Sequence, residues 1–86
     1  MTGQNTTRII SGNGQIMYRR GKIVSISAIA PVAGAKLYLY NNATGAGNPI
    51  YTADGSVSTP AVELWIPFKV LYGKVTGTAS YNLVIN

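Results

Sequence analysis

The fold class is decided by the stretch GAKLYLY at residues 34–40. Its leucines alternate strictly with Lys36, Tyr38 and Tyr40, so an extended strand here places one set of side chains on each face. A helix would need apolar residues three and four positions apart over about a dozen residues, and the sequence has no such segment. The sequence therefore predicts an all-β protein.

Further strands are predicted on both sides of this stretch, separated by Gly, Pro, Asn and Asp residues. They are expected at 15–19, 22–30, 35–40, 49–53, 62–68, 69–74 and 80–85. Six to seven short strands spaced by roughly 8–12 residues predict a small antiparallel β-sandwich. In the strand 22–30, we expect Val24 and Ile26 on one face and Ile23 on the other. Apolar residues on both faces favour a central strand, or one covered by another chain.

The first 13 residues are polar and differ from the rest, so the chain divides into an extended arm (1–13) and a β-sandwich domain (14–86). The arm contains the apolar pair Ile9-Ile10 beside Arg8. We expect it to be flexible alone and to become ordered as an added strand on a partner, with its two isoleucines facing opposite sides. Deleting residues 1–10 should then leave the β-domain folded and weaken its incorporation into an assembly.

The composition excludes most enzyme chemistry. Of 86 residues only 10% are charged, the only acidic ones are Asp54 and Glu63, and the chain has no His and no Cys. Acid–base catalysis usually uses His or paired carboxylates, zinc sites need Cys or His, and a cysteine nucleophile is absent. We therefore predict a protein that is not an enzyme and that uses no cofactor and no metal.

The small size and the low charge together favour a subunit of an assembly. A chain of this length buries only about 60% of the surface that its unfolded form exposes, so its core is marginal alone. Other copies or partners covering the surface would explain the scarcity of charge, and we expect a homo-oligomer. No apolar run approaches the ~20 residues of a membrane span. The N-terminus has no signal-peptide pattern, so we expect synthesis in the cytoplasm and use without secretion.

Two groups of residues are candidate binding surfaces. Arg19, Arg20 and Lys22 form the only basic cluster in a chain of net charge +5. An acidic protein surface is the favoured partner, and single-stranded nucleic acid is the alternative, because such binders combine basic grooves with aromatic side chains. Tyr38, Tyr40 and Trp65 lie opposite the main apolar sets of their strands. They predict a protein interface, where Tyr and Trp are enriched, with stacking on sugars as the weaker alternative.

Several motifs follow one another in an order that resembles small virion proteins of tailed bacteriophages. They are GAKLYLYNNATGAGNPI at 34–50, WIPF at 65–68, GKV at 73–75 and TGTASYNLV at 76–84. The resemblance covers residues 12–86. This chain departs from the pattern at Asn41, where Asp is common, and in its longer polar arm.

The resemblance implies a small antiparallel β-sandwich on the surface of a phage capsid. The implied role is a decoration or cement protein that binds and stabilises neighbouring major capsid subunits, with no catalytic residues to carry over. Many weak contacts repeated over a shell would then add up through avidity. A tail, fibre or adaptor component is the alternative within the virion, and a small β-barrel that binds nucleic acid is the alternative outside it. The expected partner-binding residues are Arg8, Ile9, Ile10, Arg19, Arg20, Lys22, Tyr38, Tyr40 and Trp65.

Overall fold

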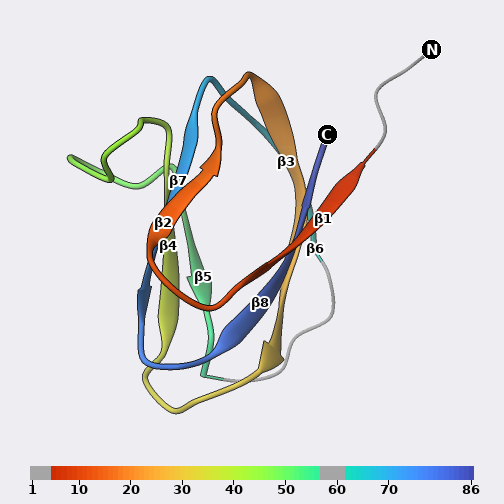
Figure 1. Cartoon of the computed structure of the whole chain (residues 1–86). Helices are drawn as coiled ribbons and strands as arrows, with labels where there is room; N and C mark the ends of the chain where they lie inside the picture. The colour runs from red at the N-terminus through yellow and green to blue at the C-terminus, as the bar shows by residue number, and fades with distance from the viewer. Residues whose placement is uncertain (1–4, 57–61) are drawn as a thin grey trace.

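The computed structural model describes residues 5–56 and 62–86, and within these ranges it is built of strands in two antiparallel sheets (Figure 1). The eight strands are β1 (Thr6–Ile10), β2 (Gly14–Met17), β3 (Gly21–Ala30), β4 (Lys36–Tyr40), β5 (Tyr51–Asp54), β6 (Val62–Phe68), β7 (Leu71–Thr76) and β8 (Ser80–Ile85). A helix long and apolar enough to cross a membrane is not found in the described part of the chain. The all-β prediction is confirmed, with one strand more than expected.

The strand order identifies the sandwich as a jelly roll. One sheet has the order β1-β8-β3-β6 and the other β2-β7-β4-β5. The chain thus behaves as one long hairpin, in which β1 pairs with β8, β2 with β7, β3 with β6 and β4 with β5. Rolling this hairpin up sends successive pairs to alternate sheets, which is the jelly-roll arrangement.

The core lies between the two sheets and is filled by the alternating residues of their strands. Leu37 and Leu39 are fully buried, as the pattern at 34–40 predicts. They face the fully buried Tyr81, Leu83 and Ile85 of β8 in the opposite sheet, within one hydrophobic cluster. Period-two alternation on each sheet therefore supplies the apolar surface that the sandwich buries.

The expected faces of β3 are wrong at Ile23. The pairing of β3 shifts register between Ile23 and Ser25, so Val24 is an extra residue relative to β8. Such a bulge reverses the alternation. As a result Ile23 and Ile26 both belong to the core cluster, whereas Val24, although only 7% exposed, lies outside it. The prediction that β3 is a central strand holds, because it lies between β8 and β6.

The boundary drawn after residue 13 also differs from the structure. Thr6–Ile10 form β1, which pairs with β8 from Thr6 opposite Ile85 to Ile10 opposite Tyr81. Ile10 packs against the core and Ile9 is 60% exposed, so the two isoleucines do face opposite sides. The sequence predicts that this segment adds to a partner's sheet, whereas in the structure it is an edge strand of the chain's own sheet.

Candidate partner-binding site

The basic cluster lies at one end of the sandwich, where two turns meet. Residues 18–20 connect β2 to β3, and residues 69–70 connect β6 to β7. Gly21 is paired with Phe68 in one sheet and Met17 with Leu71 in the other, so the two turns run side by side (Figure 1, upper end). Both turns cross from one sheet to the other, and together they close this end of the roll.

Asn41 ties a third segment to these turns. Its side-chain Oδ1 accepts hydrogen bonds from the backbone N–H groups of Lys69, at 2.7 Å, and Val70, at 3.4 Å. The loop that follows β4 is thereby fixed to the β6–β7 turn. The basic side chains around it consequently project from a connected surface rather than from separate loops.

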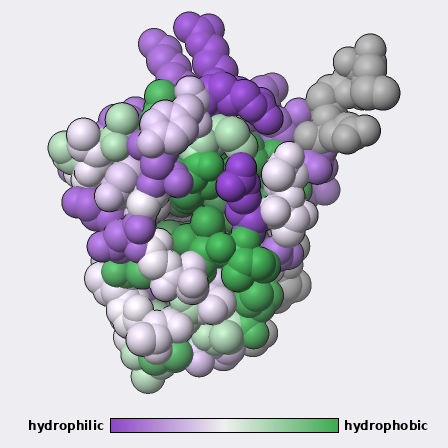
Figure 2. Space-filling view, in the orientation of Figure 1, coloured by the Kyte–Doolittle hydropathy of each residue, from purple (hydrophilic) through white to green (hydrophobic). Residues whose placement is uncertain are grey.

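Positive charge is concentrated at this end. It carries Arg19, Arg20, Lys22 and Lys69, which are four of the seven basic residues of the chain. Neither acidic side chain is here, because Asp54 ends β5 at the opposite end and Glu63 lies near the start of β6. Figure 2 shows the strongly hydrophilic side chains projecting from the same end. We call this surface, together with Tyr18 and Trp65, the basic end.

Two open hollows flank Arg20. One, of about 390 Å³, is lined by Arg20, Gly21, Lys22, Trp65 and Asn86. The other, of about 310 Å³, is lined by Arg20, Asn41, Pro67, Phe68 and Lys69. The first combines an indole ring with two cationic side chains and the side-chain amide of Asn86. We call it the Trp65 pocket.

The position of Trp65 depends on a distortion of edge strand β6. Ile23 pairs with Ile66 and Ser25 with Glu63, so the single residue Val24 lies opposite both Leu64 and Trp65. Trp65 has φ of +54° and is the only non-glycine residue with positive φ in the ranges 5–56 and 62–86. This left-handed conformation costs an L-residue roughly 1–2 kcal/mol, and a bulky side chain there is a marked outlier. The indole nevertheless remains 47% exposed.

The floor of the Trp65 pocket is held rigidly by backbone pairing. The Lys22 N–H donates to the Asn86 carbonyl at 2.8 Å, and the Asn86 N–H donates to the Lys22 carbonyl at 2.9 Å. At Gly21 a Cβ would lie 2.6 Å from the Asn86 carbonyl oxygen, so only glycine allows this close approach. The backbone that carries Lys22 is therefore fixed relative to β8, which leaves its side chain as the adjustable part.

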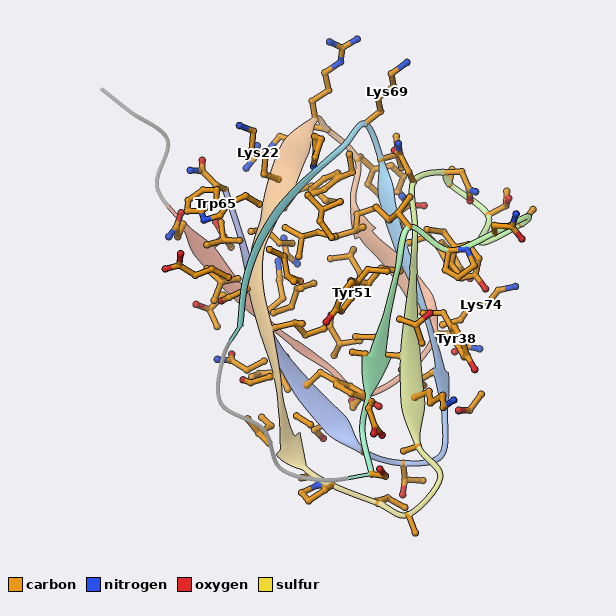
Figure 3. The ribbon with its side chains drawn as sticks, turned by 180° about the vertical axis from the view of Figure 1, so that it is seen from behind. Lys22, Tyr38, Tyr51, Trp65, Lys69 and Lys74 are labelled. Atoms are coloured by element: carbon orange, nitrogen blue, oxygen red, sulfur yellow. The ribbon has the colours of Figure 1, made fainter. Side chains whose placement is uncertain are left out.

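The structure does not bring the three expected aromatic residues together. Trp65 is on β6 of one sheet, whereas Tyr38 and Tyr40 are on β4 of the other, and Figure 3 shows Trp65 and Tyr38 on opposite sides of the molecule. Tyr40 is only 8% exposed, and the Lys74 Nζ lies 5.4 Å from the centroid of its ring. The expected aromatic surface is thus partly covered by the chain itself.

The covering segment is the loop between β4 and β5. The Asn42 Oδ1 accepts hydrogen bonds from the backbone of Thr44 and Gly45, and its Nδ2 donates to the Ala46 carbonyl at 2.8 Å. Gly45, at φ +73°, lies so close to Lys74 and Tyr72 that a Cβ would approach both within 3 Å. This contact holds the loop on the outer face of the second sheet.

The remaining predicted residues lie away from the basic end. Arg8 is exposed on β1 and pairs with Leu83 of β8. Leu83 in turn pairs with Ile26 of β3, which lies four residues along that strand from Lys22. Sequence reasoning did not assign Lys69, Tyr18 or Asn86 to the site. Lys69 and Asn86 are 47 and 64 residues from Lys22, and only the jelly-roll pairing brings them near. Tyr18, 79% exposed beside Arg19, could have been included on its adjacency alone.

The chemistry of the basic end is that of binding. Its groups offer positive charge, hydrogen-bond donors and the exposed aromatic side chains of Tyr18 and Trp65. Within the described residues, no three side chains of His, Cys, Asp or Glu come together as a possible metal site. Comparisons of the chain with protein-family models, with curated proteins and with solved structures found no match.

Proposed function

We propose that the chain is a non-enzymatic structural protein of a bacteriophage virion, a decoration or cement protein that binds neighbouring capsid subunits through its basic end. The observation that carries the proposal is the placement of four basic residues and an exposed tryptophan on one end that has no acidic side chain. Such a surface complements an acidic protein surface, and its charge would speed and orient docking.

The fold supports this proposal by analogy. Jelly rolls occur in viral capsid domains and in lectin domains, among others. Because the same fold serves unrelated functions, it is compatible with both a capsid role and a sugar-binding role, and the choice between them rests on the surface residues. A sugar-binding role would favour an exposed aromatic platform, and Tyr38, Tyr40 and Trp65 do not form one. The resemblance of residues 12–86 to small phage virion proteins then favours the capsid role.

Location in the particle is the direct test. Cryo-electron microscopy of virions that contain this chain should show it on the outer capsid surface, with the basic end toward an acidic patch of the major capsid protein. Density restricted to the tail would replace the capsid role by a tail, fibre or adaptor role. Density on the shell with the basic end facing solvent would contradict the proposed docking mode.

A matched pair of variants tests the role of charge. Arg19→Gln/Lys69→Gln removes two charges from the basic end, and Arg8→Gln/Lys36→Gln removes two from elsewhere. We expect the first variant to bind particles stripped of this protein about tenfold or more weakly and the second to bind them nearly as wild type, with wild-type binding weakening as salt shortens the screening length. Equal losses in the two variants would mean that only the net charge matters.

Nucleic acid is the second candidate partner. Tyr18 and Trp65, 79% and 47% exposed, border the cationic side chains, and single-strand binders use this combination. A salt-dependent gel shift with single-stranded DNA, lost when Arg19, Arg20 and Lys22 are all replaced by Gln, would favour this alternative. The same protein would then fail to bind stripped particles.

A further inference from the structure

The strained conformation of Trp65 points to a more specific role for this residue. A left-handed conformation is unfavourable for tryptophan, and glycine or asparagine would occupy it with less strain. Strain of this kind persists where the surroundings impose it, and it clusters at binding and switch sites. The bulge places the indole beside two cations, where it is 47% exposed. Packing inside the chain therefore leaves about half of this large side chain available to a ligand.

The charges around the pocket define the ligand. Arg20 and Lys22 supply two cationic groups, and Asn86 adds an amide beside them. The nearest acidic residue along the same strand is Glu63, two residues before Trp65. A carboxylate placed between Arg20 and Lys22 would gain charge-assisted hydrogen bonds. An apolar group next to that carboxylate would cover the indole ring.

We infer that the Trp65 pocket binds an acidic segment of a partner protein, with a carboxylate between Arg20 and Lys22 and a neighbouring apolar side chain against the indole. This inference rests on the proposed docking function and names the contact within it. A protein segment is favoured over a nucleic acid strand because the strand would need cations along its whole path. Away from the pocket, the outer face of this sheet presents Ser27, Asn82 and Glu63, which offer a phosphate backbone no positive charge.

The chain contains its own reporter for this contact. Trp65 is its only tryptophan, so the intrinsic tryptophan emission comes from the pocket alone. The probe is an octapeptide of alternating Glu and Pro, with a Gln and Pro octapeptide as the uncharged control. Proline rings stack readily on aromatic side chains, and the peptide is extended and soluble. We expect the Glu peptide to change the Trp65 emission in a saturable, salt-sensitive way and the Gln peptide to leave it unchanged.

Substitutions in the pocket separate binding from folding. Lys22→Gln should weaken peptide binding about tenfold or more, whereas Lys36→Gln, which removes an exposed cation opposite Asp54 and outside the pocket, should leave it unchanged. Trp65→Gly keeps the bulge and removes the indole, so its peptide binding is followed by calorimetry. We expect Trp65→Gly to lose binding and to remain folded, because the strain that glycine relieves offsets part of the burial lost with the half-exposed indole.

Four outcomes would overturn the inference. A saturable response to single-stranded DNA without a response to the Glu peptide would assign the pocket to nucleic acid. No change in Trp65 emission with either the Glu peptide or single-stranded DNA would show that the pocket does not bind acidic peptide segments. A large fall in the melting temperature of Trp65→Gly, with peptide binding kept, would show that the indole serves mainly to stabilise the fold. If Trp65→Gly still binds stripped particles as wild type, the pocket inference fails and docking by the rest of the basic end stands.

Discussion

Tyr81 is fully buried in the core, and its hydroxyl group has no hydrogen-bond partner among the described residues. A buried polar group without a partner costs about 1–3 kcal/mol in lost hydration. We therefore expect Tyr81→Phe to stabilise the fold by about 1 kcal/mol, which corresponds to a rise of roughly 4–8 °C in melting temperature for a domain of this size. Differential scanning calorimetry checks this, with the exposed Tyr18→Phe as a control that should change little.

The same side chain also sets a pH dependence. Burial, together with the negative charge of Asp54, raises the pKa of Tyr81 above its usual value of 10.0. Unfolding would expose the phenol and lower its pKa, so this contribution to stability is complete below about pH 10 and is lost as the pH rises above it. Urea titrations over this alkaline range should therefore show a shallower loss of stability in Tyr81→Phe than in the wild type. Identical slopes would mean that the phenol is not desolvated.

Gly55 lies against the Tyr81 hydroxyl so closely that a Cβ on residue 55 would overlap it. The backbone there is also held, because the Gly55 N–H donates to the Ala35 carbonyl and the Gly55 carbonyl accepts from Val32. Gly55→Ala should cost about 1–3 kcal/mol through overpacking. In the Tyr81→Phe background the cost should be smaller by at least about 0.5 kcal/mol. Additive effects in this double-mutant cycle would place the clash elsewhere.

At the scale of elements, β1 is where sequence and structure differ most. Its five residues follow a polar stretch and show no clear alternation, so nothing local indicates a strand. The pairing with β8 decides it, and that partner is at the other end of the chain. Local alternation did suffice for β4 and β8, whose inward residues are all buried. Bulges are equally hidden from the sequence, which is why the face of Ile23 and the conformation of Trp65 could not be predicted.

The two isoleucines of β1 give a matched test of this pairing. Ile10 packs against the core, whereas Ile9 is 60% exposed on the outer face. We expect Ile10→Ala to lower the free energy of unfolding by about 1–3 kcal/mol and Ile9→Ala to change it by less than about 0.5 kcal/mol. Equilibrium urea denaturation measures both. Equal small effects would restore the view of residues 6–10 as an arm that adds little to the domain.

Deletion of residues 1–10 now has a different expected result from the one that the sequence suggests. Removing β1 would expose the edge of β8 and uncover the side of the core that Ile10 closes. A sandwich of this size has little stability to spare. We therefore expect the truncated chain to lose cooperative thermal unfolding and to bind a hydrophobic dye, rather than to remain a folded domain that only docks less well. A sharp melting transition near the wild-type temperature would contradict this.

On the scale of the whole molecule, the jelly roll makes nearly every pairing distant in sequence. Thr6 lies opposite Ile85, and Gly14 lies opposite Gly73. Among the strands of the described residues, only β4 and β5, joined by the loop at 41–50, form a local hairpin. The basic end has the same origin, because its residues come from β3, from β6 and from the turns that join β2 to β3 and β6 to β7. The surface proposed to bind a partner therefore forms only when the roll closes.

This topology predicts slow folding and a late role for β1. Proteins dominated by non-local strand pairs fold in milliseconds to seconds, because the entropy of closing long loops is lost before the stabilising strand contacts form. The local hairpin of β4 and β5 closes the shortest loop, whereas docking β1 on β8 closes the longest. A residue whose contacts form after the transition state affects mainly the unfolding rate. In stopped-flow urea experiments, Ile10→Ala should thus accelerate unfolding and leave refolding almost unchanged, while Leu39→Ala on β4 should slow refolding. If Ile10→Ala instead slowed refolding and Leu39→Ala mainly accelerated unfolding, β1 and β8 would pair before β4 and β5 do.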